Sequence, residues 1–179
     1  MRYFIIKGRF QPFHYGHLQV VQSAITLLQT DDVLVLAAMC PFDLDIGIVD
    51  KTFAESAAEH RLPERNPWGA AVALIALNEV AMHCSESKRR IITTMMPYPN
   101  LAWPVVKTWF PQNRTWVIPK SSEKFDDIKA QFYLSQNEEV IRVADNLGIS
   151  GRELRESFLS HDIEKFKKGI PEFLHGIYV

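Results

Sequence analysis

Cysteine and long hydrophobic runs are scarce in this chain of 179 residues. The two cysteines, Cys40 and Cys84, are too few for a disulfide framework, and we interpret them as buried thiols in a reducing compartment. No apolar run approaches the roughly 20 residues that span a bilayer, and the N-terminus lacks the long apolar region of a signal peptide. These absences lead us to expect a cytoplasmic protein with no membrane contact.

Net charge is nearly absent as well. The 20 Lys and Arg residues oppose 21 Asp and Glu residues, which leaves a formal net charge of −1. This balance gives no overall attraction to nucleic acid or to an anionic membrane, so any phosphate binding must be local. The length and the hydrophobic content of 47% are ordinary for one globular domain, which we place at residues 1–179.

The most informative stretch is residues 2–29. Residues 3–6 form a short apolar run closed by Gly8, which predicts a buried strand, and apolar residues recur at helical spacing from Leu18 to Leu28. The loop between them reads GRFQPFHYGH and keeps two glycines, a proline, an arginine and two histidines. A strand, a glycine-containing loop and a helix place backbone N–H groups and a helix N-terminus where phosphate can bind.

The side chains of this loop favour the same ligand. His14 and His17 are three residues apart, so they face one pocket if the helix begins near Tyr15. Arg9 and Lys7 add positive charge beside them. A zinc site is the first alternative, but no cysteine or third histidine lies at a supporting spacing. Two core histidines without a role are the second. The sequence therefore predicts a polyphosphate site.

Two motifs resemble one family. GRFQPFHYGH is similar to the signature of the nucleotidyltransferases that carry an HxGH motif, and most similar to nicotinamide mononucleotide (NMN) adenylyltransferases of the archaeal type. Residues 149–155, ISGRELR, resemble that family's ISGTxxR element, about 130 residues further along. The resemblance implies transfer of an adenylyl group from ATP to NMN, with NAD and pyrophosphate as products.

The resemblance also implies roles for individual residues. His17 would contact the α-phosphate, His14 the bridging or β-phosphate, and Arg155 the outer phosphates. The catalytic residues implied are His14, His17 and Arg155. The nucleotide- and substrate-binding residues implied are Gly8, Arg9, Phe10, Gly16, Trp103, Ser150, Gly151 and Arg152. Mg²⁺ is expected to bridge the nucleotide phosphates, held mostly through the nucleotide and water, with no protein metal ligand.

Trp103 is the residue that selects NMN among acceptors. It matches the family's N-x-x-W element, whose tryptophan stacks on the nicotinamide ring, and an aromatic face suits a cationic pyridinium. The alternative is a core tryptophan at the start of a helix. The family's polar and charged residues after its N-P-F element fall here on Val72 and Ala73, and Arg152 replaces a threonine.

These departures keep two other functions open. The first is a sister transferase that uses ATP or CTP with another phosphate acceptor, such as phosphopantetheine or a polyol phosphate. The second is a nucleotide-binding sensor module that has lost activity. Whether the chain forms a homo-oligomer is also open.

The rest of the chain predicts the fold. Apolar runs at 33–39, 90–96, 114–118 and 139–143 predict four more strands, with helices between them at 70–82, after 103 and at 121–132. This alternation predicts an α/β fold, a Rossmann-like doubly wound parallel sheet of about five strands in a single domain, with ligand outside the carboxyl ends of the strands. We expect Asn66 to cap a well-buried helix at 70–82, residues 41–65 to cover the site as a lid, and residues 165–179 to pack on the domain.

Overall fold

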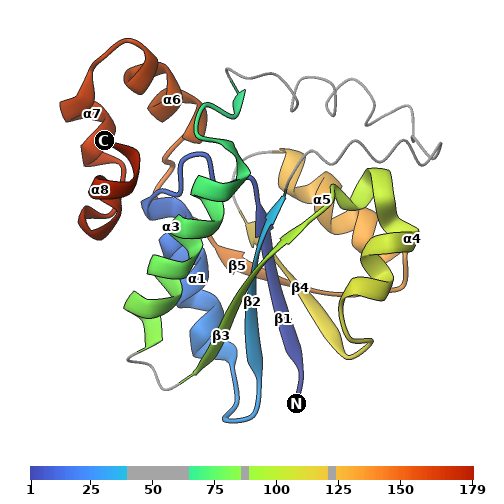
Figure 1. The fold of residues 1–179 in the computed structure, drawn as a ribbon. Coiled ribbons are helices and arrows are strands. Elements are labelled where there is room, and N and C mark those ends of the chain that lie inside the picture. The colour runs from blue at the N-terminus through green and yellow to red at the C-terminus, as the bar shows by residue number, and fades with distance from the viewer. Residues whose placement is uncertain (40–64, 86–88, 121–123) are drawn as a thin grey trace.

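The computed structural model describes residues 1–39, 65–85, 89–120 and 124–179, and its centre is a sheet of five parallel strands (Figure 1). The strand order is β3-β2-β1-β4-β5. The strands are β1 (Tyr3–Gly8), β2 (Val33–Met39), β3 (Arg90–Met96), β4 (Arg114–Lys120) and β5 (Glu139–Ala144). The predicted doubly wound parallel sheet is confirmed. The expected lid at 41–65 lies outside the described residues, apart from Arg65.

Helices cover both faces of the sheet. Helices α1 (Tyr15–Leu27) and α3 (Gly69–Cys84) lie on one face, and α4 (Pro99–Trp109) and α5 (Lys124–Ser135) lie on the other (Figure 1). Alternate residues of β1 serve the two faces, because Phe4 and Ile6 pack in one core cluster and Ile5 packs in the second. Among the described residues, no helix is both long and apolar enough to cross a membrane.

The C-terminal part of the chain forms short helices beside the α1–α3 face. These are α6 (Gly151–Leu159), α7 (Ile163–Lys168), the 3₁₀ helix η3 (Glu172–Leu174) and α8 (His175–Tyr178). Four of their side chains, Leu154, Phe166, Leu174 and Tyr178, are buried in the first core cluster, and so is Ile170 from the turn between α7 and η3. The last residues of the chain are therefore part of the same core as the first strand.

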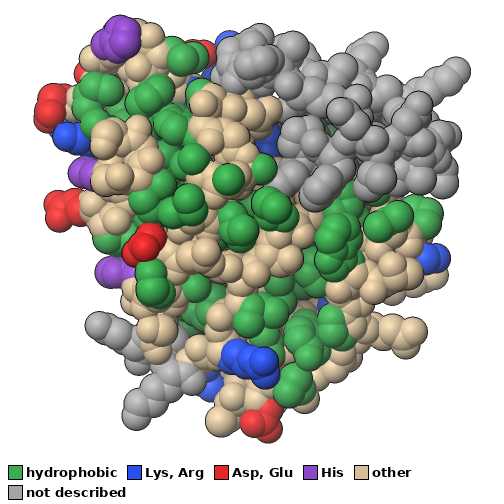
Figure 2. All heavy atoms as spheres, in the orientation of Figure 1, with side chains coloured by type: hydrophobic (Ala, Val, Ile, Leu, Met, Phe, Trp, Pro, Cys, Tyr) green, Lys and Arg blue, Asp and Glu red, His purple; other side chains and the backbone are tan. Residues whose placement is uncertain are grey.

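Helix α3 differs from the prediction in two ways. It begins at Gly69 with Trp68 in the N-cap position and no side-chain cap, so the expected Asn66 cap is wrong. The helix is also less buried than expected, because Ile75 and Met82 are 51% and 57% exposed. The helix lies on one side of the sheet and buries a single stripe, which leaves apolar side chains on the surface over α3 and β3 (Figure 2).

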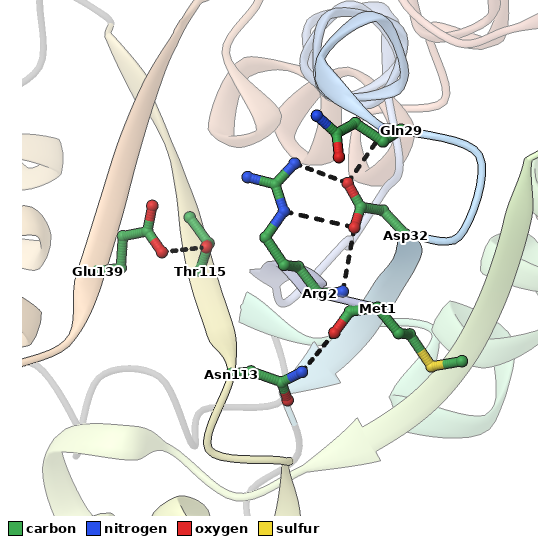
Figure 3. Close-up of polar contacts among 7 residues, drawn as sticks. All are labelled: Met1, Arg2, Gln29, Asp32, Asn113, Thr115 and Glu139. Atoms are coloured by element: carbon green, nitrogen blue, oxygen red, sulfur yellow. Dashed lines mark hydrogen bonds and ion pairs between the residues drawn. The ribbon is translucent and has the colours of Figure 1, made fainter.

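The amino-terminal ends of the strands are held by polar contacts between neighbouring segments (Figure 3). The Asp32 carboxylate accepts hydrogen bonds from Arg2 Nη2 at 2.8 Å and from the backbone N–H groups of Arg2 and Gln29 at 3.0 and 2.9 Å. The hydrogen bond from the Arg2 side chain, followed by these backbone bonds, lowers the pKa of Asp32 to about 2. Thr115 donates to Glu139 at 2.8 Å across β4 and β5. At this end of the sheet, these polar groups are paired donor to acceptor within the protein.

Candidate functional site

A pocket of about 430 Å³ lies at the carboxyl ends of the strands. Its walls come from the loop after β1, the ends of β2 and β4, and the segment after β5. The chain passes from β1 to β2 and β3 on one side and returns to β4 on the other, so the sheet order reverses between β1 and β4. Ligands of open α/β sheets bind at this kind of position.

Most of the predicted site residues lie in the walls of this pocket. Those that line it are Gly8, Arg9, Phe10, His14, His17, Ser150, Gly151, Arg152 and Arg155. Gly16 is buried directly below, where an added Cβ would lie 3.1 Å from the ring of His14. Trp103 is the exception, and its place is described below.

The two histidines cap helix α1 reciprocally. His14 is the N-cap residue, and its Nδ1 accepts a hydrogen bond from the backbone N–H of His17 at 3.4 Å. In return, Nδ1 of His17 accepts from the backbone N–H of His14 at 3.3 Å. The rings stack with their centroids 3.7 Å apart. This is the arrangement of a capping box, with imidazoles in place of the usual hydroxyl and carboxylate.

This capping arrangement assigns the tautomer of both rings. Because each Nδ1 accepts a hydrogen bond, a neutral ring carries its proton on Nε2. Burial, followed by the charge of Arg155, lowers the pKa of His14 to about 4, and burial followed by His14 lowers that of His17 well below its usual range. An added Cβ at Gly151 would lie 3.5 Å from His14 Nε2, so the Nε2 edge of His14 faces the start of α6. The pair thus offers neutral N–H donors at neutral pH.

Arginines surround these donors. Arg155 is 7% exposed and donates to the carbonyl oxygen of Gln11 at 2.6 Å, while Arg9 donates to the Arg65 carbonyl oxygen at 3.5 Å. Burial, followed by the charges of Arg9 and Arg65, lowers the pKa of Arg155 to about 10. Burial and neighbouring positive charge both disfavour the charged form of a guanidinium. An anion would relieve that crowding.

The start of α6 forms the opposite wall. Ser150 is the N-cap residue and its Oγ accepts from the Glu153 backbone N–H at 3.4 Å. The first turns of α1 and α6 therefore both lie at the pocket, and each presents the positive end of its helix dipole there. Arg152 lies at the rim, paired with Glu156 at 2.9 Å, and is well exposed. We call one part of the pocket the arginine–histidine side; it is lined by Arg9, His14, His17, Ser150, Gly151, Arg152 and Arg155.

The loop between β1 and α1 is braced from below. Phe10 adopts a positive φ of 52° and packs its ring over Gly8, where an added Cβ would lie 2.9 Å from Phe10 Cε1. The Phe10 ring is 2% exposed and meets the edge of His17 at a centroid distance of 5.1 Å. From the far end of the chain, the Tyr178 hydroxyl accepts from the Phe13 backbone N–H at 2.9 Å. Phe10 thus supports the histidines from within the core.

Trp103 lies outside the lining of the pocket, within α4 and beside the second core cluster. Its ring meets those of Phe132, Tyr133 and Trp116 at centroid distances of 5.6, 5.7 and 6.1 Å. Helix α4 also begins earlier than predicted and is kinked at Ala102, ahead of Pro104. Stacking of Trp103 on nicotinamide stays a prediction, and the pocket as described includes no contact from it.

Val72 and Ala73 are also away from the pocket. Ala73 is buried in the first core cluster and Val72 packs against that cluster. The substitutions expected to remove phosphate contacts therefore fall on packing positions of α3.

Sequence reasoning missed several residues of the pocket. Lys129, Phe125 and Asp126 come from α5, and Asp145 follows β5. They belong to no motif. They lie beside the motif residues only because β4 and β5 follow β1 in the sheet order. We call one part of the pocket the lysine side; it consists of the three α5 residues together with Lys7, Met39, Ile118 and Pro119.

Asp145 is the pocket residue whose surroundings bear on whether the site fits Mg²⁺. Burial, followed by Asp126, raises the pKa of the Asp145 carboxyl, and its buried Oδ1 has no hydrogen-bond partner among the described residues. In that part of the chain, His, Cys, Asp and Glu form no group of three or more that could hold a metal ion. If phosphates bind in the pocket, one unpartnered carboxylate oxygen beside them would fit a cation held chiefly by phosphate oxygens and water.

Comparison with known proteins adds one family. Residues 5–55 match the family model described as Cytidylyltransferase-like. The match covers β1, the histidine loop, α1 and β2, less than a third of the chain. It supports a nucleotidyltransferase, and it leaves the acceptor open. No curated protein matches the chain.

Two solved structures are similar at low sequence identity. A protein with unknown function from Archaeoglobus fulgidus is 15% identical, with a TM-score of 0.46 over 84% of this chain and 94% of its own. TmcAL from Thermotoga maritima, solved with alpha-thio ATP, is 12% identical, with a TM-score of 0.44 over 99% of this chain and 55% of its own. These similarities are too weak to carry an argument about function.

Proposed function

We propose that this protein is a nucleotidyltransferase that joins a nucleoside monophosphate, taken from ATP, to a phosphate-bearing acceptor and releases pyrophosphate. The observation that carries the proposal is that two helix N-termini, the neutral rings of His14 and His17, the buried Arg155 and the half-buried Arg9 line one pocket. Oriented donors of this kind, held away from water, stabilise charge that develops on phosphate oxygens. The Cytidylyltransferase-like match to the same loop and helix supports the same reaction class.

The reaction needs no nucleophile from the protein. An acceptor phosphate oxygen forms a bond to the α-phosphorus of ATP, and the bond from that phosphorus to the pyrophosphate oxygen breaks. His17 and His14 would donate through Nε2–H to oxygens at the α-phosphate and the bridge, while Arg155 and Arg9 would hold the outer phosphates. Both neutral histidines can donate without a change of protonation, because their pKa values lie below neutral pH.

Mg²⁺, when bound with the nucleotide, would neutralise part of the negative charge of the phosphates. Asp145 is the residue that would hold it, because its buried Oδ1 is unpartnered among the described residues. The histidine pair is a poor choice for this ion, because Mg²⁺ prefers oxygen ligands and each Nδ1 is already engaged in capping α1.

NMN is the first acceptor to test, because the sequence motifs resemble those of NMN adenylyltransferases. The position of Trp103 favours a second candidate, a sister transferase with another phosphate acceptor, because no tryptophan of α4 lines the described pocket. The two candidates share the nucleotide site and the attacking phosphate, and they differ in the molecule that carries this phosphate.

Pyrophosphate release by the purified protein tests the proposal. ATP and CTP would each be paired with NMN, phosphopantetheine and a polyol phosphate, with Mg²⁺ and with chelator. We expect Mg²⁺-dependent release with ATP and one of the acceptors. Release with an acceptor other than NMN would select the sister transferase. Binding of ATP without release from any pair would refute the transfer reaction and favour a nucleotide sensor.

A further inference from the structure

Lys7 lies one residue before the end of β1 and directs its side chain to the α5 face of the sheet. Its Nζ is 5.5 Å from the centroid of the Tyr133 ring, which packs in the second core cluster with Ile5. Its polar contact among the described residues is the sulfur of Met39, at 3.8 Å. An aromatic face and a thioether are weak partners for an ammonium group. In the described part of the chain, no carboxylate accepts a hydrogen bond from Lys7.

Lys129 is the second cation on the lysine side. Its Nζ lies 2.7 Å from Asp126 Oδ1 and 4.7 Å from the centroid of the Phe125 ring, and its side chain is 26% exposed. Its charge lowers the pKa of both Lys7 and His17. Lys129 is therefore close enough to act on both sides of the pocket, and it links the lysine side to the histidines.

Asp126 is paired with Lys129 and acts on Lys7 only through its charge. Burial, followed by the charge of Lys129, lowers the pKa of Lys7 to about 7, while Asp126 opposes this change. An anion beside Lys7 would favour its charged form and would gain two cationic partners. The remaining walls of this side are apolar and consist of Met39, Ile118, Pro119 and Phe125. Such walls suit the organic part of a ligand whose charged end meets the lysines.

We propose that the lysine side binds the phosphate monoester group of the acceptor, with Lys7 and Lys129 as its contacts. This inference rests on the proposed nucleotidyl transfer and names the chemical class of the acceptor. With the triphosphate on the arginine–histidine side, an acceptor phosphate on the adjoining lysine side is placed to attack the α-phosphorus. Lys7 and Lys129 then determine specificity, since they select acceptors that carry a dianionic group.

Sulfate is the first probe, because it stays a dianion at neutral pH whereas phosphate titrates there. We expect an NMR titration of the isotope-labelled protein with sulfate to shift the backbone amide signals of residues 7–8 and 125–129. Lys7→Met and Lys129→Met should each weaken the binding that these signals report by roughly 10- to 100-fold, as for loss of a hydrogen bond to a charged group. Acetate should bind more weakly than sulfate, and equal affinities would replace the phosphate class by carboxylates.

Two variants are matched controls. Lys168→Met removes an exposed lysine of α7, and His17→Gln changes the arginine–histidine side alone. Both should leave the shifts of residues 7–8 and 125–129 unchanged. Sulfate that shifts only residues 150–152, and loses affinity in His17→Gln but not in the lysine variants, would overturn the proposal. Lys7→Met should melt at or above the wild-type temperature, because it replaces a buried ammonium group by an apolar chain; Lys7→Gln is the second variant if it does not fold.

The pH dependence gives a second readout. Sulfate affinity should fall as pH rises through about 7, because Lys7 then loses its proton. The titratable groups that face Lys7 are Asp126, Lys129 and Tyr133, all on α5, and burial raises the pKa of Tyr133 well above its usual range. Lys7→Met should remove the fall near pH 7. A profile that is the same in the wild type and in Lys7→Met would contradict the assignment of Lys7.

Kinetics separate this inference from the proposed function. With an acceptor found by pyrophosphate release, Lys7→Met should raise the acceptor KM roughly 10-fold or more, with little change in the ATP KM. A rise confined to the ATP KM would overturn the assignment to the acceptor. Sulfate binding that depends on both lysines, in a protein that turns over no acceptor, would contradict the transfer reaction while supporting the anion site.

Discussion

Arg114 and Arg155 are each 7% exposed, but they lie at opposite ends of the sheet in opposite surroundings. Arg114, at the start of β4, donates to both carboxylate oxygens of Glu138 at 2.6 and 2.5 Å and to three backbone carbonyl oxygens near the end of α4. Arg155, beyond the carboxyl ends of the strands, donates among the described residues to one acceptor, the Gln11 carbonyl oxygen. Its other charged neighbours are chiefly Arg9 and Arg65.

This difference separates a structural cation from a binding cation. A buried charge with a full set of acceptors stabilises the fold that arranges them, whereas a buried charge among like charges lowers stability until an anion arrives. The amino-terminal end, with Arg2–Asp32 and Arg114–Glu138, belongs to the first kind. The carboxyl end belongs to the second. Mutations at the two ends should therefore change different observables.

The largest effect is expected at the carboxyl end, from His17→Gln. A glutamine at this third helical position can still accept from the N-cap backbone N–H, as in a capping box, but it cannot place a donor where Nε2–H lies. We expect kcat to fall by about 10²–10³-fold, equivalent to about 3–4 kcal/mol, with little change in melting temperature. Steady-state kinetics and thermal denaturation of the same preparation check this. A fall in melting temperature with full turnover would make His17 structural.

At the amino-terminal end, Glu138→Gln should lower stability and spare the site. It keeps the shape of the side chain but leaves Arg114 without its counter-charge, which should cost about 2–4 kcal/mol of unfolding free energy. Burial alone would raise the pKa of Glu138, and the hydrogen bonds from Arg114 and Trp116 outweigh it and lower the pKa. The wild type should therefore hold this stabilisation at neutral pH and lose it as pH falls through the lowered pKa.

Denaturant unfolding of both proteins between neutral and acid pH measures this effect. The difference between the wild type and Glu138→Gln should be largest at neutral pH and shrink in acid. A difference that does not change with pH would contradict a charged Glu138 as its source.

Trp103→Ala tests whether the indole stabilises the fold or binds the acceptor. The Trp103 ring packs against those of Trp116, Phe132 and Tyr133. The Arg114 guanidinium carbon lies 5.7 Å from the centroid of the Trp103 ring. Truncation of this partly buried side chain should cost about 2–3 kcal/mol of stability. The KM values for ATP and acceptor should then change together or not at all. A selective rise in the NMN KM, with little loss of stability, would instead support stacking on nicotinamide.

The smallest effect is expected from Tyr178→Phe, which should change both stability and the ATP KM. It removes the hydroxyl that accepts from the Phe13 backbone N–H and keeps the ring in the core. We expect a loss of about 1 kcal/mol and a modest rise in the ATP KM, because the histidine loop loses its brace. Tyr15→Phe, on a half-buried tyrosine at the first residue of α1, is the control and should change neither quantity.

Much of the fold could be predicted from local patterns. Residues 33–39 and 90–96 form strands with the predicted boundaries. The first is a continuous apolar run, as is typical of a central parallel strand that is covered on both faces. The burial of α3 could not be predicted in the same way. Its sequence is apolar on all sides, and only its position on one side of β2 and β3 leaves Ile75 and Met82 exposed.

The sequence by itself determined that His14 and His17 lie together, because a spacing of three residues at a helix start places both on one side of its first turn. Tertiary structure decided what surrounds them. Arg155 and Asp145 come from beyond β5, and Lys129 comes from α5. Parallel crossovers carry these segments back beside β1, and the crowding that lowers the pKa of Lys7 and Arg155 exists only in the folded chain.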